Sequence, residues 1–404
     1  MGAAAPGAVY NARPMLNKAD KTQLRPMLKA LEARQAEMLA LLKRLVEAES
    51  PSSDKAAVDR LGAILRAEFE RMGGRVTVHS QTRFGNHLQV DFPGAGGRPA
   101  MLLGHFDTVW DLGTLKQMPW KVERGKVFGP GVYDMKVGIV MMMHAIAALR
   151  EAHGGTLPRP ITVWLVTDEE VGSTTSRPVT ESLAKNMAAV LVLEPSQGTE
   201  GALKTARKGV GSYNVEVAGV ASHSGVDFEK GHSAIVELAH QITRIQKFTD
   251  IKRGLTVNPG LISGGTRVNV VAAEAASEVD VRVSRLKDAE LLEKKFRGLK
   301  PVDRKCALRI SGGVNRPPME RSAGVVRLFR LAEEVAKGLG FKVKEKSTGG
   351  GSDGNFTAAL GVPTLDGLGG VGEGAHAVHE SVVLAEIPRR TALVAGLLAH
   401  AERG

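Results

Sequence analysis

The stretch AMLLGHFDTVW, at residues 100–110, is the part of the sequence that most clearly indicates the fold. Its first residues, Ala100 to Gly104, form a short apolar run that predicts a strand buried on both faces. Two polar side chains, His105 and Asp107, follow this strand directly. In open α/β sheets, ligands bind beyond the carboxyl ends of the strands. We therefore expect an α/β fold with a functional site at this end of the strand.

Apolar runs at residues 161–167 and 188–195 predict two more buried strands, and residues 135–151 predict a helix. Buried strands that alternate with helices are typical of an α/β domain with a mostly parallel central sheet. The N-terminal part adds two helices and two strands to this expectation. The helices are expected over 26–48 and, after a break and cap at Ser50-Pro51-Ser52-Ser53, up to Gly73-Gly74, and the strands over 75–80 and 87–92.

Residues 208–317 have a different pattern, because their strands alternate polar and apolar side chains. Alternation with period two predicts a sheet with one covered and one open face, as in an α+β domain. The first pattern resumes near residue 322. We expect two domains, a discontinuous one made of 1–207 and 318–404 and a smaller one inserted at 208–317. The strands of the insertion are expected at 212–220, 255–265, 274–283 and 306–313, and its helices at 232–246 and 287–299.

The composition excludes several classes of protein. Hydrophobic residues make up 43% of the 404, and there is one cysteine, which excludes a disordered or disulfide-stapled chain. The net charge of +11 is compatible with nucleic acid, an anionic membrane or acidic small molecules as partners. Only 4% of residues are aromatic, which argues against single-strand binding through base stacking. More than half of the positive excess lies in the insertion, which favours an acidic substrate over nucleic acid.

Neither a membrane span nor a signal peptide is indicated. No run of about 18 or more apolar residues occurs, so no span is expected. The opening MGAAAPGAVYNARPML lacks a charged start followed by a leucine-rich core. We expect a cytoplasmic protein, or a periplasmic one if a signal peptide has been removed.

Acidic residues follow several of the predicted strands. Asp134 ends a glycine-rich loop, Glu169 and Glu170 follow the strand at 161–167, and Glu194 follows the next strand. Together with His105 they would repel one another unless a cation lay among them, and these side chains are good zinc ligands. Two ions about 3.5–4 Å apart would let one carboxylate bridge them. Adjacent Glu169 and Glu170 point apart, so one could bind metal while the other takes a proton from water.

Each of these motifs is weak alone. A lone His-x-Asp is frequent in loops, a Glu-Glu pair is usually a solvated surface, and an Asp before a helix is usually an N-cap. Four such motifs, each following an apolar strand or opening a helix, would rarely occur together by chance. The set therefore indicates a metal site.

The same residues resemble a known family, the co-catalytic zinc metallopeptidases that include glutamate carboxypeptidase (carboxypeptidase G type), acetylornithine deacetylase and succinyl-diaminopimelate desuccinylase. The resemblance covers the chain after about residue 30, and the glutamate carboxypeptidase branch is the most similar. The motifs that carry it are GHFDTVW, GPGVYDMKVG, TDEEVGS, LEPS, ASHSGVDFEKGHSA, GGTRVNVVAAEA with DVR, GGGSDGNF and GAHAVHESV, and for the branch also SGGVNRPP and IPRR.

The resemblance implies a role for each residue. Asp134 would bridge two zinc ions, for which Co²⁺ or Mn²⁺ could substitute. The remaining ligands would be His105 and Glu194 for one ion, and Glu170 and His376 for the other. Glu169 would be the general base, and Asp107 would orient His105. His379 lies near His376 in GAHAVHESV; the family pattern of a His followed four residues later by Glu favours His376, and His379 could still compete for metal or line the pocket.

For the insertion, the resemblance implies a lid and dimerisation domain. His223 would reach the site of the neighbouring subunit and stabilise an oxyanion. Asn269, Arg282 and Arg316 would bind a substrate carboxylate, which Arg pairs bidentately. From the residues alone, a packed loop histidine and surface arginines are the simpler interpretations. The glycine-rich stretch at 349–356 lacks the Lys-Ser/Thr of a phosphate-binding loop and is expected to lie beside the metals or to close on substrate.

These expectations define a leading hypothesis and two others. The leading one is a dizinc hydrolase that cleaves the amide bond of a C-terminal or N-acylated, glutamate-like amino acid, with a small-molecule or peptide substrate that has a free carboxylate. An N-acyl-amino-acid deacylase, such as an acetylornithine deacetylase or a desuccinylase, would use the same metal residues with a different pocket. A non-catalytic binding protein on the same fold would be expected to lack Glu169 or a ligand, and all of these residues are present.

Overall fold

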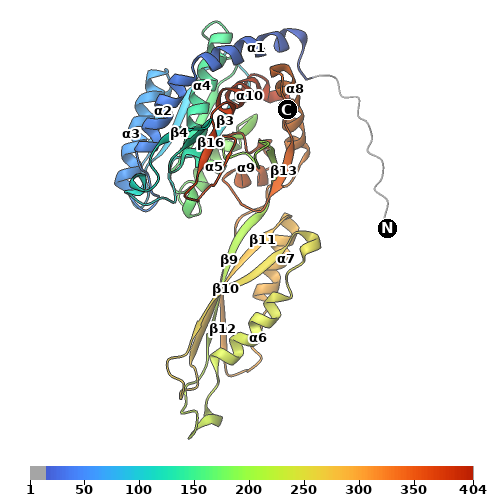
Figure 1. Cartoon of the computed structure of the whole chain (residues 1–404). Helices are drawn as coiled ribbons and strands as arrows, with labels where there is room; N and C mark the ends of the chain where they lie inside the picture. Colours follow the sequence, from blue (N-terminus) through green and yellow to red (C-terminus); the bar gives the residue numbers. More distant parts are fainter. Residues whose placement is uncertain (1–14, 404) are drawn as a thin grey trace.

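A six-stranded mixed sheet lies at the centre of the larger part of the chain in this computed structural model, which describes residues 15–403 (Figure 1). The strand order is β1-β2-β6-β3-β7-β14; β6, β3, β7 and β14 run parallel, and β2 is antiparallel to both of its neighbours. The expected α/β fold with a mostly parallel sheet is therefore confirmed. The strands are β1 (Arg75–His79), β2 (His87–Phe92), β3 (Ala100–His105), β6 (Ile161–Val166), β7 (Ala189–Val192) and β14 (Thr364–Leu365).

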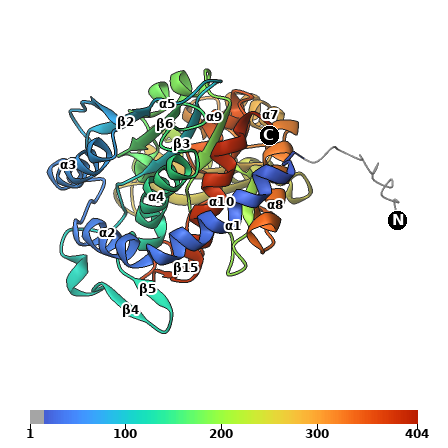
Figure 2. The ribbon, with the colours of Figure 1, turned by 90° about the horizontal axis from the view of Figure 1, so that it is seen from above.

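Helices cover both faces of this sheet. Alternate side chains of β3 enter different cores, Leu102 the larger one and Leu103 the smaller one, as the two-residue period of a strand requires. Seen from above, α1, α4 and α10 lie side by side over the larger core (Figure 2). The helices are α1 (Lys18–Ala33), α2 (Gln35–Glu47), α3 (Lys55–Arg71), α4 (Val137–Ala152), α5 (Arg177–Ala184), α8 (Ala323–Leu339), α9 (Gly354–Ala359) and α10 (Glu386–His400).

The N-terminal helices differ from the expectation. The single helix expected over 26–48 is two helices, because the backbone leaves the helical region at Arg34 (φ −95°, ψ 9°). The apolar spacing continues across this break, so periodicity alone does not reveal it. Asp54, not a serine, caps α3 by accepting a hydrogen bond from the Ala57 backbone N–H at 2.8 Å. Residues 1–14, on which the expectation about a signal peptide depends, lie outside the described residues.

The insertion contains, between residues 209 and 316, a four-stranded antiparallel sheet in the order β10-β11-β9-β12, with its own apolar core. The register places Val210 beside both Arg282 and Arg316 at the end next to the larger part, and Ala218 beside Ala307 at the other end. Ten residues of strand span about 30 Å, which accounts for the elongated shape in Figure 1. The elements are β9 (Gly209–Ala218), α6 (Ala234–Gln246), β10 (Thr256–Gly264), β11 (Glu274–Val283), α7 (Leu286–Arg297) and β12 (Ala307–Arg316).

Two smaller sheets complete the larger part. β8 (Leu203–Arg207) and β13 (Glu345–Thr348) pair in parallel; the other sheet contains β4 (Lys121–Glu123), β5 (Lys126–Phe128), β15 (Gly372–Glu373) and β16 (Ser381–Val383). Among the described residues, one helical stretch, Val132–Ala152, is long and apolar enough to cross a membrane, and 83% of its apolar window is buried in the protein. This burial is what a core helix shows.

Candidate metal centre

His105 ends β3 and is 1% exposed. Its Nδ1 lies 3.0 Å from the backbone carbonyl oxygen of Asp107 and 3.4 Å from the Asp107 carboxylate. This pairing leaves Nε2 directed at two acids, 3.2 Å from Asp134 Oδ1 and 3.5 Å from Glu194 Oε1. Asp107 thus contacts His105 more closely through its carbonyl than through its side chain, which also accepts a hydrogen bond from the Ser52 hydroxyl at 2.7 Å.

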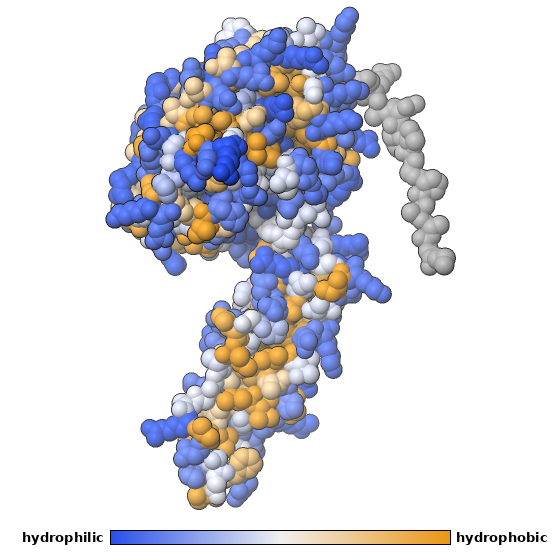
Figure 3. All heavy atoms as spheres, viewed as in Figure 1, coloured by the Kyte–Doolittle hydropathy of each residue, from blue (hydrophilic) through white to orange (hydrophobic). Residues whose placement is uncertain are grey.

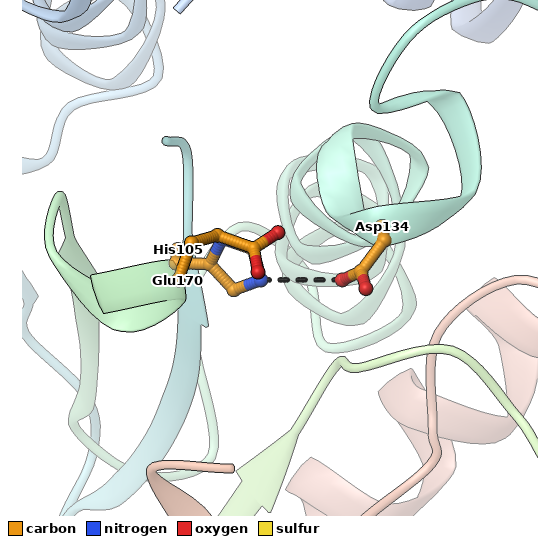
Figure 4. Close-up of side chains that lie close together, drawn as sticks. All are labelled: His105, Asp134 and Glu170. Atoms are coloured by element: carbon orange, nitrogen blue, oxygen red, sulfur yellow. Dashed lines mark hydrogen bonds and ion pairs between the residues drawn. The ribbon is translucent and has the colours of Figure 1, made fainter. Parts of the chain in front are cut away.

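Asp134 lies between two imidazoles. Its Oδ1 faces His105, as Figure 4 shows, and its Oδ2 lies 3.5 Å from His376 Nε2. The loop before α4 is held by Glu380, whose carboxylate accepts hydrogen bonds from the backbone N–H groups of Tyr133 at 2.8 Å and Asp134 at 3.0 Å. These hydrogen bonds fix the backbone at Asp134, from which one carboxylate reaches both imidazoles.

Glu170 and His376 form the second side of the cluster. His376 Nε2 lies 3.2 Å from Glu170 Oε2. His376 has a φ of 62°, a region that a residue other than glycine rarely adopts, and its side chain is 51% exposed. His379 is exposed, and no ion pair among the described residues joins it to these acids. The geometry thus directs His376, and not His379, at the cluster.

Glu169 lies beside the cluster but is held by an arginine. Arg316 Nη2 is 2.8 Å from Glu169 Oε1, and it also contacts the Ser173 hydroxyl at 2.7 Å and Asp353 Oδ1 at 3.2 Å. Ligand atoms of Glu169, His105 and Glu194 lie within 4.8 Å of one another, as do those of His105, Asp134 and Glu170. Distance alone therefore does not distinguish Glu169 from the candidate metal ligands. Its ion pair with Arg316 does distinguish it.

The protonation of the cluster follows from burial and close contacts. Hydrogen bonds with Asp134 and Glu170 raise the pKa of His376 to about 10. Burial opposes a charge on His105, but hydrogen bonds with Asp107, Asp134 and Glu194 raise its pKa well above the ordinary value. Burial raises the pKa of Glu169 well above its usual range, against the opposing effect of Arg316. In the metal-free protein, protons on the two imidazoles thus balance the acids.

The donors fit a divalent cation. Carboxylate oxygens and imidazole nitrogens are good ligands for zinc and similar ions. The buried Oε1 of Glu170 has no hydrogen-bond partner among the described residues, and an unpaired buried acceptor is costly. A cation would satisfy this oxygen and replace the imidazole protons, since metal binding requires neutral imidazoles and ionised carboxylates.

Three of the residues expected to bind substrate lie outside this cluster. His223 and Asn269 are exposed in neighbouring loops, where the Ser224 N–H donates to the Asn269 carbonyl at 3.1 Å. By the register, these loops lie at the end of the insertion remote from the larger part. Arg282 lies at the near end and pairs with Asp280 at 3.0 Å. Arg316, the fourth such residue, is in the cluster and paired with acids.

Several residues of the site were not identified from the sequence. Glu380 holds the Asp134 loop, Asp353 and Ser173 hold Arg316, and Arg207 contacts Glu194 at 3.3 Å. The Ser173 hydroxyl also donates to Asp353. These contacts join segments that are far apart in the chain, so residue spacing contains no sign of them. Two of these residues had a signal in the sequence: the glycine-rich motif contains Asp353, and the pattern of a His followed four residues later by Glu that favours His376 contains Glu380.

The end of β3 and loops from distant parts of the chain bring two imidazoles and several carboxylates to one point, an arrangement typical of metal-dependent hydrolases. The sequence matches Peptidase family M20/M25/M40 over residues 101–400, and the chain belongs to this family. It is 30% identical over 380 residues to carboxypeptidase G2 from Pseudomonas sp. (strain RS-16), an alignment that covers 92% of this chain and 91% of the relative.

Solved structures share the fold. Aminopeptidase PepT from Bacillus cereus superposes with a TM-score of 0.75 at 21% identity, covering 91% of this chain and 98% of the other. The M20 family metallo-carboxypeptidase Sso-CP2 from Sulfolobus solfataricus gives 0.71 at 15% identity, covering 91% and 99%. Human carnosine dipeptidase 1 gives 0.63 at 16% identity, covering 94% and 100%. At these identities the likeness concerns the fold alone.

Proposed function

We propose that this enzyme is a dizinc hydrolase that cleaves the amide bond of a C-terminal or N-acylated amino acid with a glutamate-like carboxylate. The observation that carries the proposal is the position of Asp134, whose two oxygens face His105 and His376. One carboxylate between two imidazoles, each with a further glutamate beside it, suits two ions that share a ligand. The identity to carboxypeptidase G2 favours a carboxypeptidase within the family.

The residues divide into two ligand sets around Asp134. His105 and Glu194 would hold one ion, and Glu170 and His376 the other. When bound, the ions would polarise the scissile carbonyl and lower the pKa of a water molecule. Asp107 would keep His105 in the tautomer that leaves Nε2 free, because its carbonyl accepts from Nδ1.

Glu169 would move the protons. Its carboxylate would accept a proton from the attacking water and then donate it to the leaving amine. A base whose pKa is raised by burial suits both steps, since it binds the proton more firmly than an exposed glutamate would. Arg316 keeps the charged form available by pairing with one oxygen, and Oε2 remains for the water.

The substrate carboxylate would be bound by side chains of the insertion. Arg282, at the near end of the insertion, is the proposed ligand from the same chain, and Arg316 would contribute once it leaves Glu169. Asn269, whose loop neighbours that of His223 at the remote end, would contribute from a second copy of the chain. His223 would act across a subunit boundary, because the register places its loop about 30 Å from the near end of its own sheet. This arrangement requires a second copy of the chain.

We propose that the second copy pairs through β10, an edge strand of the insertion. Leu261 and Ile262 on β10 are each 64% exposed, and Val236 on α6 is 55% exposed. Figure 3 shows apolar residues gathered along this elongated part of the molecule. An unpaired edge strand with exposed apolar side chains favours pairing with another strand.

A deacylase specific for N-acetyl-ornithine or N-succinyl-diaminopimelate would use the same metal ligands. A panel of folate-like glutamate conjugates, dipeptides, N-acyl-glutamates and N-acetyl-ornithine, assayed with the Zn²⁺-loaded enzyme, would separate these possibilities. We expect the highest kcat/KM on a conjugate with a C-terminal glutamate. Preference for N-acetyl-ornithine would overturn the proposed specificity, and no hydrolysis of any amide would overturn the proposed reaction.

A further inference from the structure

Arg207 is a buried arginine at the end of β8, where the chain leaves the larger part, and it is 4% exposed. Its Nε and Nη2 lie 2.8 and 2.9 Å from the two oxygens of Asp366, which is a bidentate pair. Its Nη1 donates to the Gly351 carbonyl at 2.9 Å. Nη2 also lies 3.3 Å from Glu194 Oε2. Every nitrogen of this guanidinium therefore has an acceptor.

The two carboxylates are held unequally. Asp366 is fully buried, takes the two short contacts and also accepts from the Ser352 hydroxyl at 2.6 Å. Glu194 takes one longer contact, through Oε2. The charge of Arg207 is thus largely balanced by Asp366, and the remaining contact orients Glu194 without strongly competing for its charge.

The orientation of the Glu194 carboxylate matters because one of its oxygens faces Arg207 and the other faces the candidate metal centre. Oε2 faces Arg207, while Oε1 lies 3.5 Å from His105 Nε2. Without Arg207, the carboxylate would be free to rotate about its terminal torsion, which is a soft one. With Arg207 in place, one oxygen is fixed on the side of the proposed metal ion.

We propose that Arg207, held by Asp366, is a positioning residue that fixes Glu194 for one of the two metal ions. This inference rests on the proposed function, in which Glu194 is a ligand. Replacing a residue that orients a metal ligand typically lowers the metal affinity by about 10–100-fold. Arg207 therefore affects one ion through Glu194, while the ion at Glu170 and His376 is expected to keep its affinity.

The test compares metal binding by the wild-type enzyme and Arg207→Met. Metal-free protein is titrated with Co²⁺ and with Zn²⁺ in competition with a chelator, and metal per chain and the visible Co²⁺ spectrum are recorded. We expect two ions for the wild type, and for the variant one unchanged ion and one about 10–100-fold weaker. Arg207→Met with two ions of wild-type affinity would overturn the inference.

Arg390→Met is the matched control. Arg390 is also buried, at 2% exposed, and it supports the same loop by donating to the carbonyls of Gly367 and Gly369, the latter at 3.2 Å. Its hydrogen bonds go to carbonyl groups, without contact to Glu194. Wild-type metal binding in this control assigns the effect to the Arg207–Glu194 contact, whereas the same loss in both variants would assign it to loop support and overturn the inference.

A double variant covers the case in which Arg207→Met fails to fold because Asp366 is left buried without its cation. Arg207→Met with Asp366→Asn removes both charges together, and circular dichroism and thermal unfolding would establish its folding. The same selective loss of one ion is expected, and retention of both ions would count against the inference. Failure of the wild-type protein to bind two ions would instead refute the proposed dizinc centre, so the two failures are distinguishable.

Discussion

The guanidinium of Arg316 lies 2.8 Å from both the carboxylate and the backbone carbonyl of Glu169. Arg316 is the last residue of β12. A side chain of the insertion therefore contacts the acid that is proposed as general base. Burial raises the pKa of Glu169, and the nearby Arg316 opposes that rise. The protonation of Glu169 thus depends on where the end of β12 lies.

Replacing the proposed base should separate metal binding from turnover. Glu169→Gln removes the proton acceptor while leaving the ligands in place, and general-base catalysis contributes about 10²–10⁴-fold. We expect kcat to fall by at least this range with metal content unchanged. Glu170→Gln, at the adjacent position, is the control and should lose metal as well. Full activity of Glu169→Gln would refute the assignment.

Arg316→Met should lower both stability and kcat. It leaves Glu169 and Asp353 buried without their cation, and breaking a buried ion pair costs about 3–5 kcal/mol. In the structure Arg316 contacts Glu169, the proposed base. We therefore expect its loss to change kcat more than KM. Urea unfolding and steady-state kinetics would measure these. A rise in KM with kcat unchanged would show that Arg316 serves only the substrate carboxylate and does not act on Glu169.

Asp134→Asn should remove both ions, since each of its oxygens faces a different imidazole. His376→Ala should remove one ion, because that ring faces only the Glu170 side of the cluster. His379→Ala is the control for the latter and should leave two ions per chain. Metal analysis of the purified proteins after dialysis measures all three. Metal loss in the His379 variant at the level of the His376 variant would mean that the ligand had been misassigned.

His87 should make the protein less stable in acid. The backbone N–H of Thr167 donates to its Nδ1 at 3.2 Å, which requires the neutral ring. Burial lowers the pKa of His87 to about 4, below the value of about 6.5 in an unfolded chain. The unfolded state therefore binds more protons between these values, so the stabilisation is present above about pH 6.5 and is lost as the pH falls to about 4. The difference amounts to about 3 kcal/mol.

His87→Gln should remove this part of the pH dependence. The measurement is the free energy of unfolding of metal-free wild-type and variant protein, obtained in urea at about pH 7 and about pH 4.5. The wild type should lose more stability between the two conditions than the variant does. Parallel losses in both proteins would show that His87 is not responsible.

The proposed dimer should depend on the exposed side chains of β10. Leu261→Asp with Ile262→Asp puts charge on this edge and should shift the protein to monomer in analytical ultracentrifugation. Activity should fall with it, because His223 would no longer reach a neighbouring site. Val122→Asp, at a 49% exposed position on β4, is the control. A dimer that survives the β10 change would place the interface elsewhere.

The strands and acids of the site were predictable because each acid directly follows an apolar run or opens a helix. His105 and Glu194 lie where β3 and β7 end, so local pattern and the rule for open sheets were sufficient. The break at Arg34 was not predictable, because the apolar spacing is continuous there. Nor were the contacts of Arg316 and Arg207, since an arginine at a strand end has no local pattern that identifies a buried carboxylate as its partner.

The two ends of the insertion lie against each other. A side chain at Gly209 would come within 2.8 Å of the Arg316 carbonyl and of Pro318, so the chain leaves and re-enters the larger part through one narrow point. A short loop could therefore replace the intervening residues without pulling the remainder apart. Such a shortened protein would have to retain Arg207 and Arg316, which lie at the two junctions and contact Glu194 and Glu169. If the insertion is exchanged with that of a relative, the junctions should therefore lie between these two arginines, so that both are retained.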